Sequence, residues 1–122
     1  GMKLNLREID RLVAGKVMGW KIDEQVSNDD VVAVFDETGN WGTFKPTEWI
    51  QDAWQVVEKM REGRIFSLCD AWDENDEPIF YANFQYNDGY HVVNYDAYAK
   101  TATLAICLAA LKAVGVEVEV AK

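Results

Sequence analysis

The sequence contains a single histidine, His91, so any histidine-dependent nucleophilic catalysis would have to use that side chain. Neither a Gly-x-Ser-x-Gly motif nor the surroundings of a papain-like cysteine accompany it. A histidine beside a predicted hairpin turn is usually a surface or half-buried polar residue. We therefore expect His91 to have no catalytic role, and we expect the chain not to be an enzyme.

A cluster of carboxylates between two predicted strands could supply oxygen ligands to a hard cation. Its members are Asp70, Asp73, Glu74, Asp76 and Glu77. Their spacing lacks the central glycine and the terminal glutamate of an EF-hand loop. A solvated hairpin loop explains the cluster better than a metal site does, so we expect no metal and no cofactor there.

The two cysteines and the glycines also lack the spacing of known binding motifs. Cys69 and Cys107 form no Cys-x-x-Cys motif and have no histidine at metal-ligand spacing, which favours two buried, reduced thiols over a disulfide or a zinc site. The glycines match neither the P-loop nor the Gly-x-Gly-x-x-Gly pattern. Nucleotide hydrolysis is therefore disfavoured.

The formal net charge of -9 is unevenly distributed along the chain. Residues 65–99 contain seven acidic side chains and no lysine or arginine, and residues 23–49 contain seven acidic side chains and one lysine. Such a surface repels phosphates, and no basic patch interleaved with aromatic residues is present, so we expect no nucleic-acid partner. The simplest role of these charges is to keep the protein in solution.

Aromatic residues supply the candidates for a contact surface. Trp49, Trp54 and Trp72 fall on predicted core faces, whereas Trp20 and Trp41 show no burial pattern. Aromatic side chains in such positions are enriched at interfaces, although they can also close over helix ends as part of the core. The candidate interaction surface that we select comprises Trp20, Trp41, Phe44, Asp70 and Trp72.

Two amphipathic helices are predicted in the first half of the chain. The first begins at Asn5, which forms a capping-box pattern with Glu8, and ends at Gly19. The second has Thr47 as its predicted N-cap and ends at Gly63. Its apolar stripe comprises Trp49, Ile50, Ala53, Trp54, Val57 and Met60, and its opposite face comprises Gln51, Asp52, Gln55, Glu58 and Lys59.

The second half of the chain predicts a meander of strands followed by a buried helix. Residues 65–72, 79–86 and 90–95 have an apolar period of two and are separated by turn-forming residues, which is typical of antiparallel strands. One face should carry Phe66, Leu68, Trp72, Phe80, Ala82 and Phe84, and the other Tyr81, Asn83 and Gln85. Residues 101–115 are apolar except for Lys112 and predict a helix buried on most sides.

Two segments leave alternatives open. Residues 31–35 are either a short strand or part of a long loop that carries Trp41 and Phe44. Residues 116–120 are either a short edge strand or a frayed tail. Together the elements predict an α+β fold, an α-β-α sandwich with an antiparallel sheet of three to five strands between helical layers.

The length of the chain fits one domain, which we expect to span residues 2–122, with Gly1 as a remnant of tag cleavage. The N-terminal region lacks the apolar run of a signal peptide. The segment 101–115 is shorter than the roughly 20 apolar residues of a membrane span. We therefore expect a soluble, cytoplasmic protein without a membrane partner.

Three blocks of sequence resemble the phage ABA sandwich domain family, small proteins of bacteriophages and prophages, including one from a Bacillus genome. The blocks are residues 11–20, residues 44–47 leading into 53–60, and Thr101 followed by residues 104–113. Thr103 stands where the family has proline, which affects only where the last helix starts. The resemblance implies a sheet between helical layers and a viral or prophage origin. It implies no established activity and no catalytic residues.

Three functions fit these observations. The first is a non-enzymatic phage accessory protein in the cytoplasm of the bacterial host, which contacts a protein partner or forms a homodimer. The second is a small-ligand binding domain that uses the same aromatic residues as a pocket beside Trp72 and Asp70. The third is an acidic decoy that occupies a basic host protein.

Overall fold

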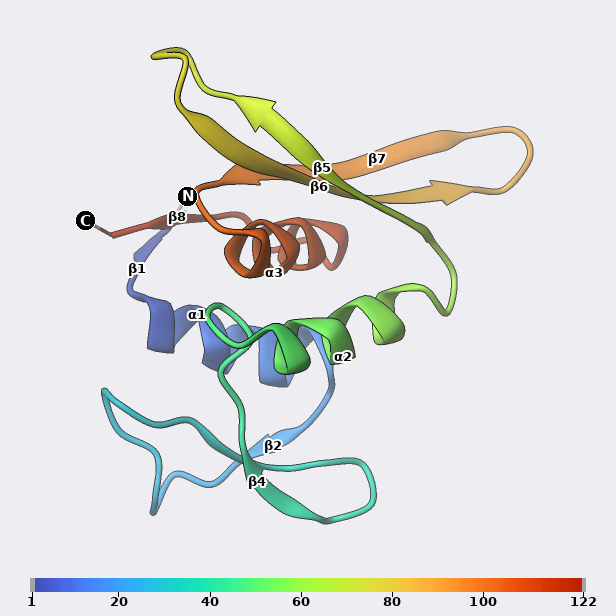
Figure 1. The fold of residues 1–122 in the computed structure, drawn as a ribbon. Coiled ribbons are helices and arrows are strands. Elements are labelled where there is room, and N and C mark those ends of the chain that lie inside the picture. Colours follow the sequence, from blue (N-terminus) through green and yellow to red (C-terminus); the bar gives the residue numbers. More distant parts are fainter. Residues whose placement is uncertain (1, 122) are drawn as a thin grey trace.

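A computed structural model describes residues 2–121 of the chain. The elements, in order, are β1 (Met2–Leu4), α1 (Leu6–Leu12), a π-helical turn η1 (Val13–Val17), β2 (Lys21–Ile22), β3 (Ala33–Phe35), β4 (Trp41–Thr43), α2 (Ile50–Met60), β5 (Ile65–Trp72), β6 (Pro78–Asn87), β7 (Val92–Ala99), α3 (Ala102–Ala113) and β8 (Val118–Val120). Figure 1 shows them stacked in layers.

The layers alternate between sheets and helices. The antiparallel sheet β5-β6-β7 lies on α3, the helices α1 and α2 lie below α3, and the small antiparallel sheet β2-β3-β4 lies below them (Figure 1). This arrangement confirms the predicted α+β sandwich with an antiparallel three-stranded sheet. Among residues 2–121, helices cover one face of the sheet β5-β6-β7 and leave its other face open.

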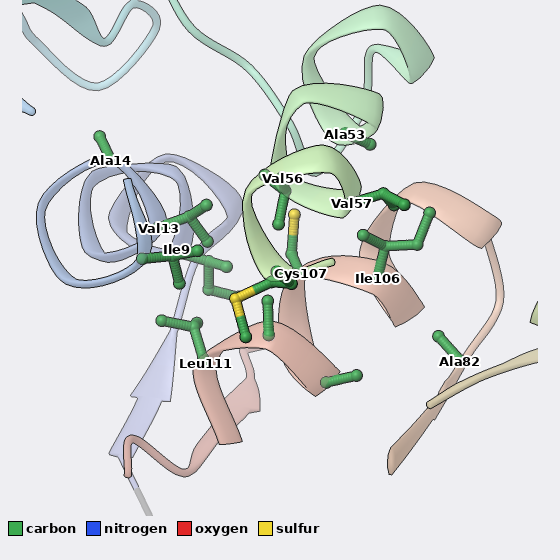
Figure 2. Packing of buried hydrophobic residues seen from close by; sticks show 14 of the residues in the cluster. Ile9, Val13, Ala14, Ala53, Val56, Val57, Ala82, Ile106, Cys107 and Leu111 are labelled. Atoms are coloured by element: carbon green, nitrogen blue, oxygen red, sulfur yellow. The ribbon is translucent and has the colours of Figure 1, made fainter. Parts of the chain in front are cut away.

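The central element is α3, as its apolar sequence predicts. One side of the helix packs on β6 and β7, and another packs on α1, η1 and α2. Figure 2 shows Ile106 and Leu111 of α3 in one cluster with Val13 and Val56. The buried residues of α3 are Thr103, Ala105, Ile106, Cys107, Ala109, Ala110 and Leu111. The helix is therefore enclosed on most of its circumference.

The first helix begins where its capping box predicts. The Asn5 side chain accepts a hydrogen bond from the Glu8 N–H at 2.9 Å, and the Glu8 carboxylate accepts one from the Asn5 N–H at 3.1 Å. These bonds satisfy two N–H groups that a helix start leaves free. The helix continues through η1 and ends before Gly19, whose φ of 73° lies in the left-handed region that glycine adopts most easily.

The predicted start of α2 is wrong, and only half of its predicted apolar stripe, Ala53, Val57 and Met60, is buried. Its N-cap is Trp49, not Thr47, and Trp49, Ile50 and Trp54 are exposed although the apolar stripe predicts their burial. Asp52, assigned to the solvent face, is buried because its carboxylate accepts a hydrogen bond from the Lys45 N–H at 2.8 Å. This bond turns one carboxylate inward, and the helix buries Ala53, Val56, Val57 and Met60 beside it.

The predicted meander is confirmed as β5, β6 and β7, with β7 extending further than expected, to Ala99. Phe66, Phe80, Ala82 and Phe84 face the core as predicted. Leu68 and Trp72 were expected beside them but are exposed, Trp72 by 71%. The reason is that α3 packs mainly on β6 and β7, while the end of β5 rises away from it (Figure 1).

The two segments that the sequence left open are both strands. Residues 33–35 form β3, the middle strand of the small sheet, so the strand interpretation of this region is confirmed. Residues 118–120 form β8, which pairs in parallel with β1, a strand that the sequence did not predict. None of the helices in residues 2–121 has the length and apolar character needed to cross a bilayer.

Candidate interaction surface

The five residues selected from the sequence do not form one surface. Trp41 lies in β4 of the small sheet and Phe44 directly follows that strand, whereas Asp70 and Trp72 lie on β5. The helical layers separate these two regions (Figure 1). Phe44 is 2% exposed and cannot contact a partner. The five residues therefore do not lie together as one surface, and Asp70 and Trp72 lie apart from Trp41 and Phe44, with which a common ligand pocket was expected.

Trp20 and Trp41 attach the small sheet to its surroundings. The Trp20 ring packs edge-on against Phe44 with centroids 4.9 Å apart, and its indole N–H donates a hydrogen bond to Glu37. The Trp41 indole N–H donates to Asp23 at 3.0 Å, although the ring is 52% exposed. Both indoles thus hold loops of this sheet in place, and Trp20 extends the core.

The open face of the sheet β5-β6-β7 is the largest feature that the five selected residues miss. Side chains alternate along a strand, so the residues between the buried ones point away from α3. We call this side the outer face. Its residues are Ile65, Ser67, Cys69, Ala71, Ile79, Tyr81, Asn83, Gln85, Asn87, Val92, Asn94, Asp96 and Tyr98. The sequence predicts the outward direction of Tyr81, Asn83 and Gln85 correctly.

Apolar and aromatic side chains are exposed on the outer face. Ile65 is 61% exposed, Tyr98 is 59% exposed, and Val92 is similarly open. The register aligns Cys69, Tyr81 and Tyr98 in one row across the three strands. The rings of Tyr81 and Tyr98 form a tilted pair with centroids 5.0 Å apart. The outer face therefore presents a pair of phenol rings in tilted contact across β6 and β7.

Hydrogen bonds join the polar residues of the outer face into a fixed arrangement. The Tyr81 hydroxyl donates to Asp96 at 3.0 Å, and the side-chain amides of Asn83 and Gln85 both donate to Asn94, at 2.9 and 3.1 Å. The Asn83 Oδ1 atom is buried and accepts no hydrogen bond from residues 2–121. Buried acceptors in proteins are nearly always paired, so this atom is an exception within the sheet.

Among the residues of the outer face, Asp96 carries the carboxylate, and it lies beside Tyr81. Desolvation and the neighbouring carboxylate of Asp96 raise the pKa of Tyr81 to about 12. The phenol therefore stays protonated throughout the physiological range and keeps donating to Asp96. Lys112 of α3 approaches Asp96 from the edge of β7, with its Nζ 3.9 Å from the carboxylate.

The two thiols differ, which corrects the prediction that both are buried. Cys69 is exposed on the outer face because its odd position in β5 points away from α3, while Cys107 is enclosed in α3. Burial raises the pKa of the Cys107 thiol well above its ordinary value. Because the reactive form is an accessible thiolate, the two cysteines should differ strongly in reactivity.

Native labelling is expected to modify Cys69 alone. An alkylating reagent should add one adduct to the folded protein and a second only after unfolding, and peptide mass spectrometry assigns each site. Two adducts on the folded protein would mean that α3 is not enclosed.

A buried polar group lies between α1, α3 and the segment before α2. Asp10 is fully buried and accepts a hydrogen bond from the Thr47 N–H at 2.9 Å, and Arg7 lies 3.2 Å from its other oxygen. Thr103 donates to the Thr47 carbonyl at 2.7 Å. These bonds explain the burial of Thr47. The burial of Asp10 could have been predicted from its position beside Ile9 and Val13, which belong to the apolar stripe of the helix.

Burial raises the pKa of Asp10 from 3.8 to about 6, so the folded protein holds this proton more tightly than the unfolded chain. The protonated carboxyl stabilises the fold fully below about pH 4, and that stabilisation is lost as the pH rises through 6. The difference between the pKa values of Asp10 in the folded and unfolded states corresponds to about 3 kcal/mol of stability at low pH.

The variant Asp10→Asn should lack this pH dependence. Its free energy of unfolding relative to wild type should rise by about 2 kcal/mol between pH 4 and pH 7. Urea denaturation of both proteins at the two pH values measures the change. A difference that stays constant with pH would contradict the raised pKa.

The other candidates for chemistry lie apart from one another. His91 is exposed at the turn between β6 and β7, with its Nδ1 3.4 Å from Asp88. In the β5–β6 turn, the Asp73 carboxylate accepts hydrogen bonds from the Asn75 and Glu77 N–H groups, as in a hairpin loop. Nowhere between residues 2 and 121 do three histidine, cysteine or acidic side chains gather closely enough to hold a metal ion.

Two surface hollows carry aromatic and charged side chains. One of about 380 Å³ is lined by Met18, Trp20, Glu37, Gln55, Glu58, Lys59 and Glu62. Another of about 290 Å³ is lined by Trp54, Arg61, Arg64, Ile65 and Phe66. In the second, the Arg64 guanidinium lies over the Tyr95 ring, and its buried Nε has no hydrogen-bond partner.

Comparison with known proteins gives one match. The model of a family described as the phage ABA sandwich domain matches residues 11–111, from within α1 to within α3. This match confirms the resemblance found in the three sequence blocks. Neither a curated protein nor a solved structure matches the chain.

Proposed function

The chain belongs to the phage ABA sandwich domain family, and from this membership we propose that it is a phage or prophage accessory protein that acts by protein–protein contact. In this proposal it works in the cytoplasm of the bacterial host and catalyses no reaction. Its contact surface is the outer face of the sheet β5-β6-β7, which replaces the five residues selected from the sequence.

The observation that carries the proposal is the exposure of large apolar side chains on a sheet face that this chain does not cover. An antiparallel sheet can face water on one side, but that side is then usually polar. Here Ile65 and Tyr98 are more than half exposed at opposite edges of the sheet, and Val92 is open as well. These apolar side chains flank the polar residues at the middle of the face, and an uncovered face that exposes large apolar side chains is a candidate surface for binding another protein.

The test is affinity capture from phage-infected host cells with three forms of the protein. The double variant Ile65→Ser/Tyr98→Ser removes apolar contact area from the outer face. The matched control Val26→Ser/Trp41→Ser removes one aliphatic and one aromatic side chain from the region of the small sheet. Because all four residues are at least 45% exposed, circular dichroism should show that both variants fold.

A protein partner should be recovered with wild type and with the control, and lost with the outer-face variant. Aromatic contacts at the centre of an interface cost about 2 kcal/mol or more when truncated, which is about thirtyfold in affinity. Recovery that is equal for all three forms would place the contact elsewhere. Recovery of no partner at any protein concentration would contradict the proposed function.

A second candidate function, the binding of a small anionic ligand, is favoured by the hollow between α2 and β5. Within residues 2–121, neither Arg61 nor Arg64 has a carboxylate within 4 Å, and both line this hollow beside Trp54 and Phe66. Guanidinium groups beside aromatic rings suit an aromatic carboxylate or phosphate. Titration with such compounds should move the Trp54 indole resonance in wild type and not in Arg64→Gln.

A further inference from the structure

We propose that the outer face of the sheet β5-β6-β7 binds a basic, arginine-bearing surface of another protein rather than a second copy of this chain. The inference rests on the proposed function and adds the chemistry of the partner. Three observations on the same sheet carry it: the distribution of charge, an unpaired acceptor at the centre of the face, and an exposed aromatic pair beside a carboxylate.

The sheet and its two hairpin turns carry only one sign of formal charge. Residues 65–99 have seven acidic side chains and no lysine or arginine. The acidic residues are Asp70, Asp73, Glu74, Asp76, Glu77, Asp88 and Asp96. Over the described part of the chain, lysine and arginine form one ion pair with them, between Lys112 and Asp96. The remaining carboxylates are free to attract a basic partner over several ångströms.

One acceptor near the centre of the outer face, the Oδ1 atom of Asn83, lacks a hydrogen-bond donor among residues 2–121. Asn83 lies on the middle strand and is only 8% exposed, and its Oδ1 accepts no hydrogen bond from residues 2–121. The side-chain oxygen of the adjacent Asn94 already accepts two, from Asn83 and Gln85. A guanidinium group carries five N–H donors in a rigid fork and could reach several acceptors at once.

The exposed aromatic pair favours arginine over lysine. Tyr98 is 59% exposed and lies two residues from Asp96 on the same side of β7, and its ring packs against Tyr81. A guanidinium plane can stack on the Tyr98 ring while its edge donates to Asp96 or Asn83. The ammonium group of lysine is a compact charge without a flat surface, so it cannot stack on the ring and donate to the acceptor at the same time.

A second copy of the chain fits this face poorly. Two outer faces in contact would bring the Asp96 carboxylates and the acidic turns of both copies together, and the segment 65–99 has no lysine or arginine to pair with them. Like charges across an interface disfavour that partner. A different protein whose contact surface has a basic rim would cover the apolar residues of the outer face without this repulsion.

The experiment uses a defined probe, a twelve-residue peptide of alternating arginine and glycine, with lysine and glutamate versions as controls. Two-dimensional nitrogen–proton NMR of the whole protein at low salt follows the titration. The arginine peptide should shift resonances of residues 67–71, 81–85 and 94–98. Its dissociation constant should be lower than that of the lysine peptide by a factor of about three or more, and the glutamate peptide should not bind.

Two variants and a matched control locate the contact. Asp96→Asn keeps an acceptor for the Tyr81 hydroxyl while removing the charge, and Tyr98→Ala removes the exposed ring. Each variant should lower the affinity for the arginine peptide by a factor of about three or more. Asp29→Asn removes the same charge from an exposed loop before β3 and should change affinity less than twofold, as expected for a distant screened charge.

Several results would overturn the inference. One is a shift pattern centred on the acidic residues of 23–37, and another is an equal loss of affinity in Asp29→Asn and Asp96→Asn. A third is a homodimer, seen by light scattering, whose formation requires Tyr98. If a protein captured from infected cells binds through Ile65 and Tyr98 yet is unaffected by Asp96→Asn, the inference fails while the proposed function stands.

Discussion

Replacing Phe44 by alanine is expected to lower the free energy of unfolding by about 3 to 5 kcal/mol, the usual range for a buried phenylalanine. Phe44 is 2% exposed, packs against Trp20, and donates its backbone N–H to the Val32 carbonyl at 2.9 Å. Urea denaturation followed by tryptophan fluorescence measures the change.

The control for this substitution lies on the same small sheet. Trp41 is larger than Phe44 but 52% exposed, so Trp41→Ala should cost about 1 kcal/mol or less. A greater loss in Trp41→Ala than in Phe44→Ala would reverse the assignment of core and surface in this sheet. Light scattering on both variants should give the molar mass of wild type, because neither side chain belongs to the outer face.

Replacing Leu111 by alanine is expected to cost about 2 to 5 kcal/mol. Leu111 is fully buried in α3, in the cluster that contains Ile9 and Val13 (Figure 2). Leu108, one turn earlier, is only half-buried and lines a surface hollow beside Tyr98. Because truncation there leaves a dent open to water instead of a cavity, Leu108→Ala should cost clearly less.

Denaturation midpoints of the two leucine variants test the position of α3 in the fold. A larger loss in Leu108→Ala than in Leu111→Ala would mean that the helix is rotated about its axis. Unchanged midpoints in both variants would mean that α3 is not the centre of the core.

The parts of the fold that sequence could predict are those determined locally. The reciprocal bonds of Asn5 and Glu8 need only a helix start, and the period-two pattern from residue 65 needs only strands and turns. The apolar segment 101–115 could hardly be stable except in the middle of the protein. These features depend on neighbours in the chain, so a single sequence contains the information.

The features that sequence missed depend on distant contacts. In α2, Asp52 is buried and accepts a hydrogen bond from the Lys45 backbone, while Trp49 and Trp54 stay exposed, and this outcome depends on contacts outside the helix. Trp72 has the pattern of a core residue, but its strand extends past the helix that would cover it. Hydrophobic pattern predicts which side chains prefer burial, and tertiary packing decides which of them obtain it.

In the candidate site, too, the sequence predicted the locally determined features and missed those that depend on distant contacts. The alternation in β6 predicted that Tyr81, Asn83 and Gln85 share a face, which the register confirms. That this face stays uncovered could not be predicted, because it depends on all three helices lying on the other side of the sheet (Figure 1). The exposure of Cys69 follows from the same arrangement.

Cys69 provides the most direct test of the claim that the outer face is the contact surface. The measurement is the rate of Cys69 alkylation in the folded protein, with and without a saturating amount of the captured partner. We expect the rate to fall at least tenfold when the partner is bound, while Cys107 stays unmodified in both samples. An unchanged rate at Cys69 with the partner fully bound would show that the contact lies elsewhere on the molecule.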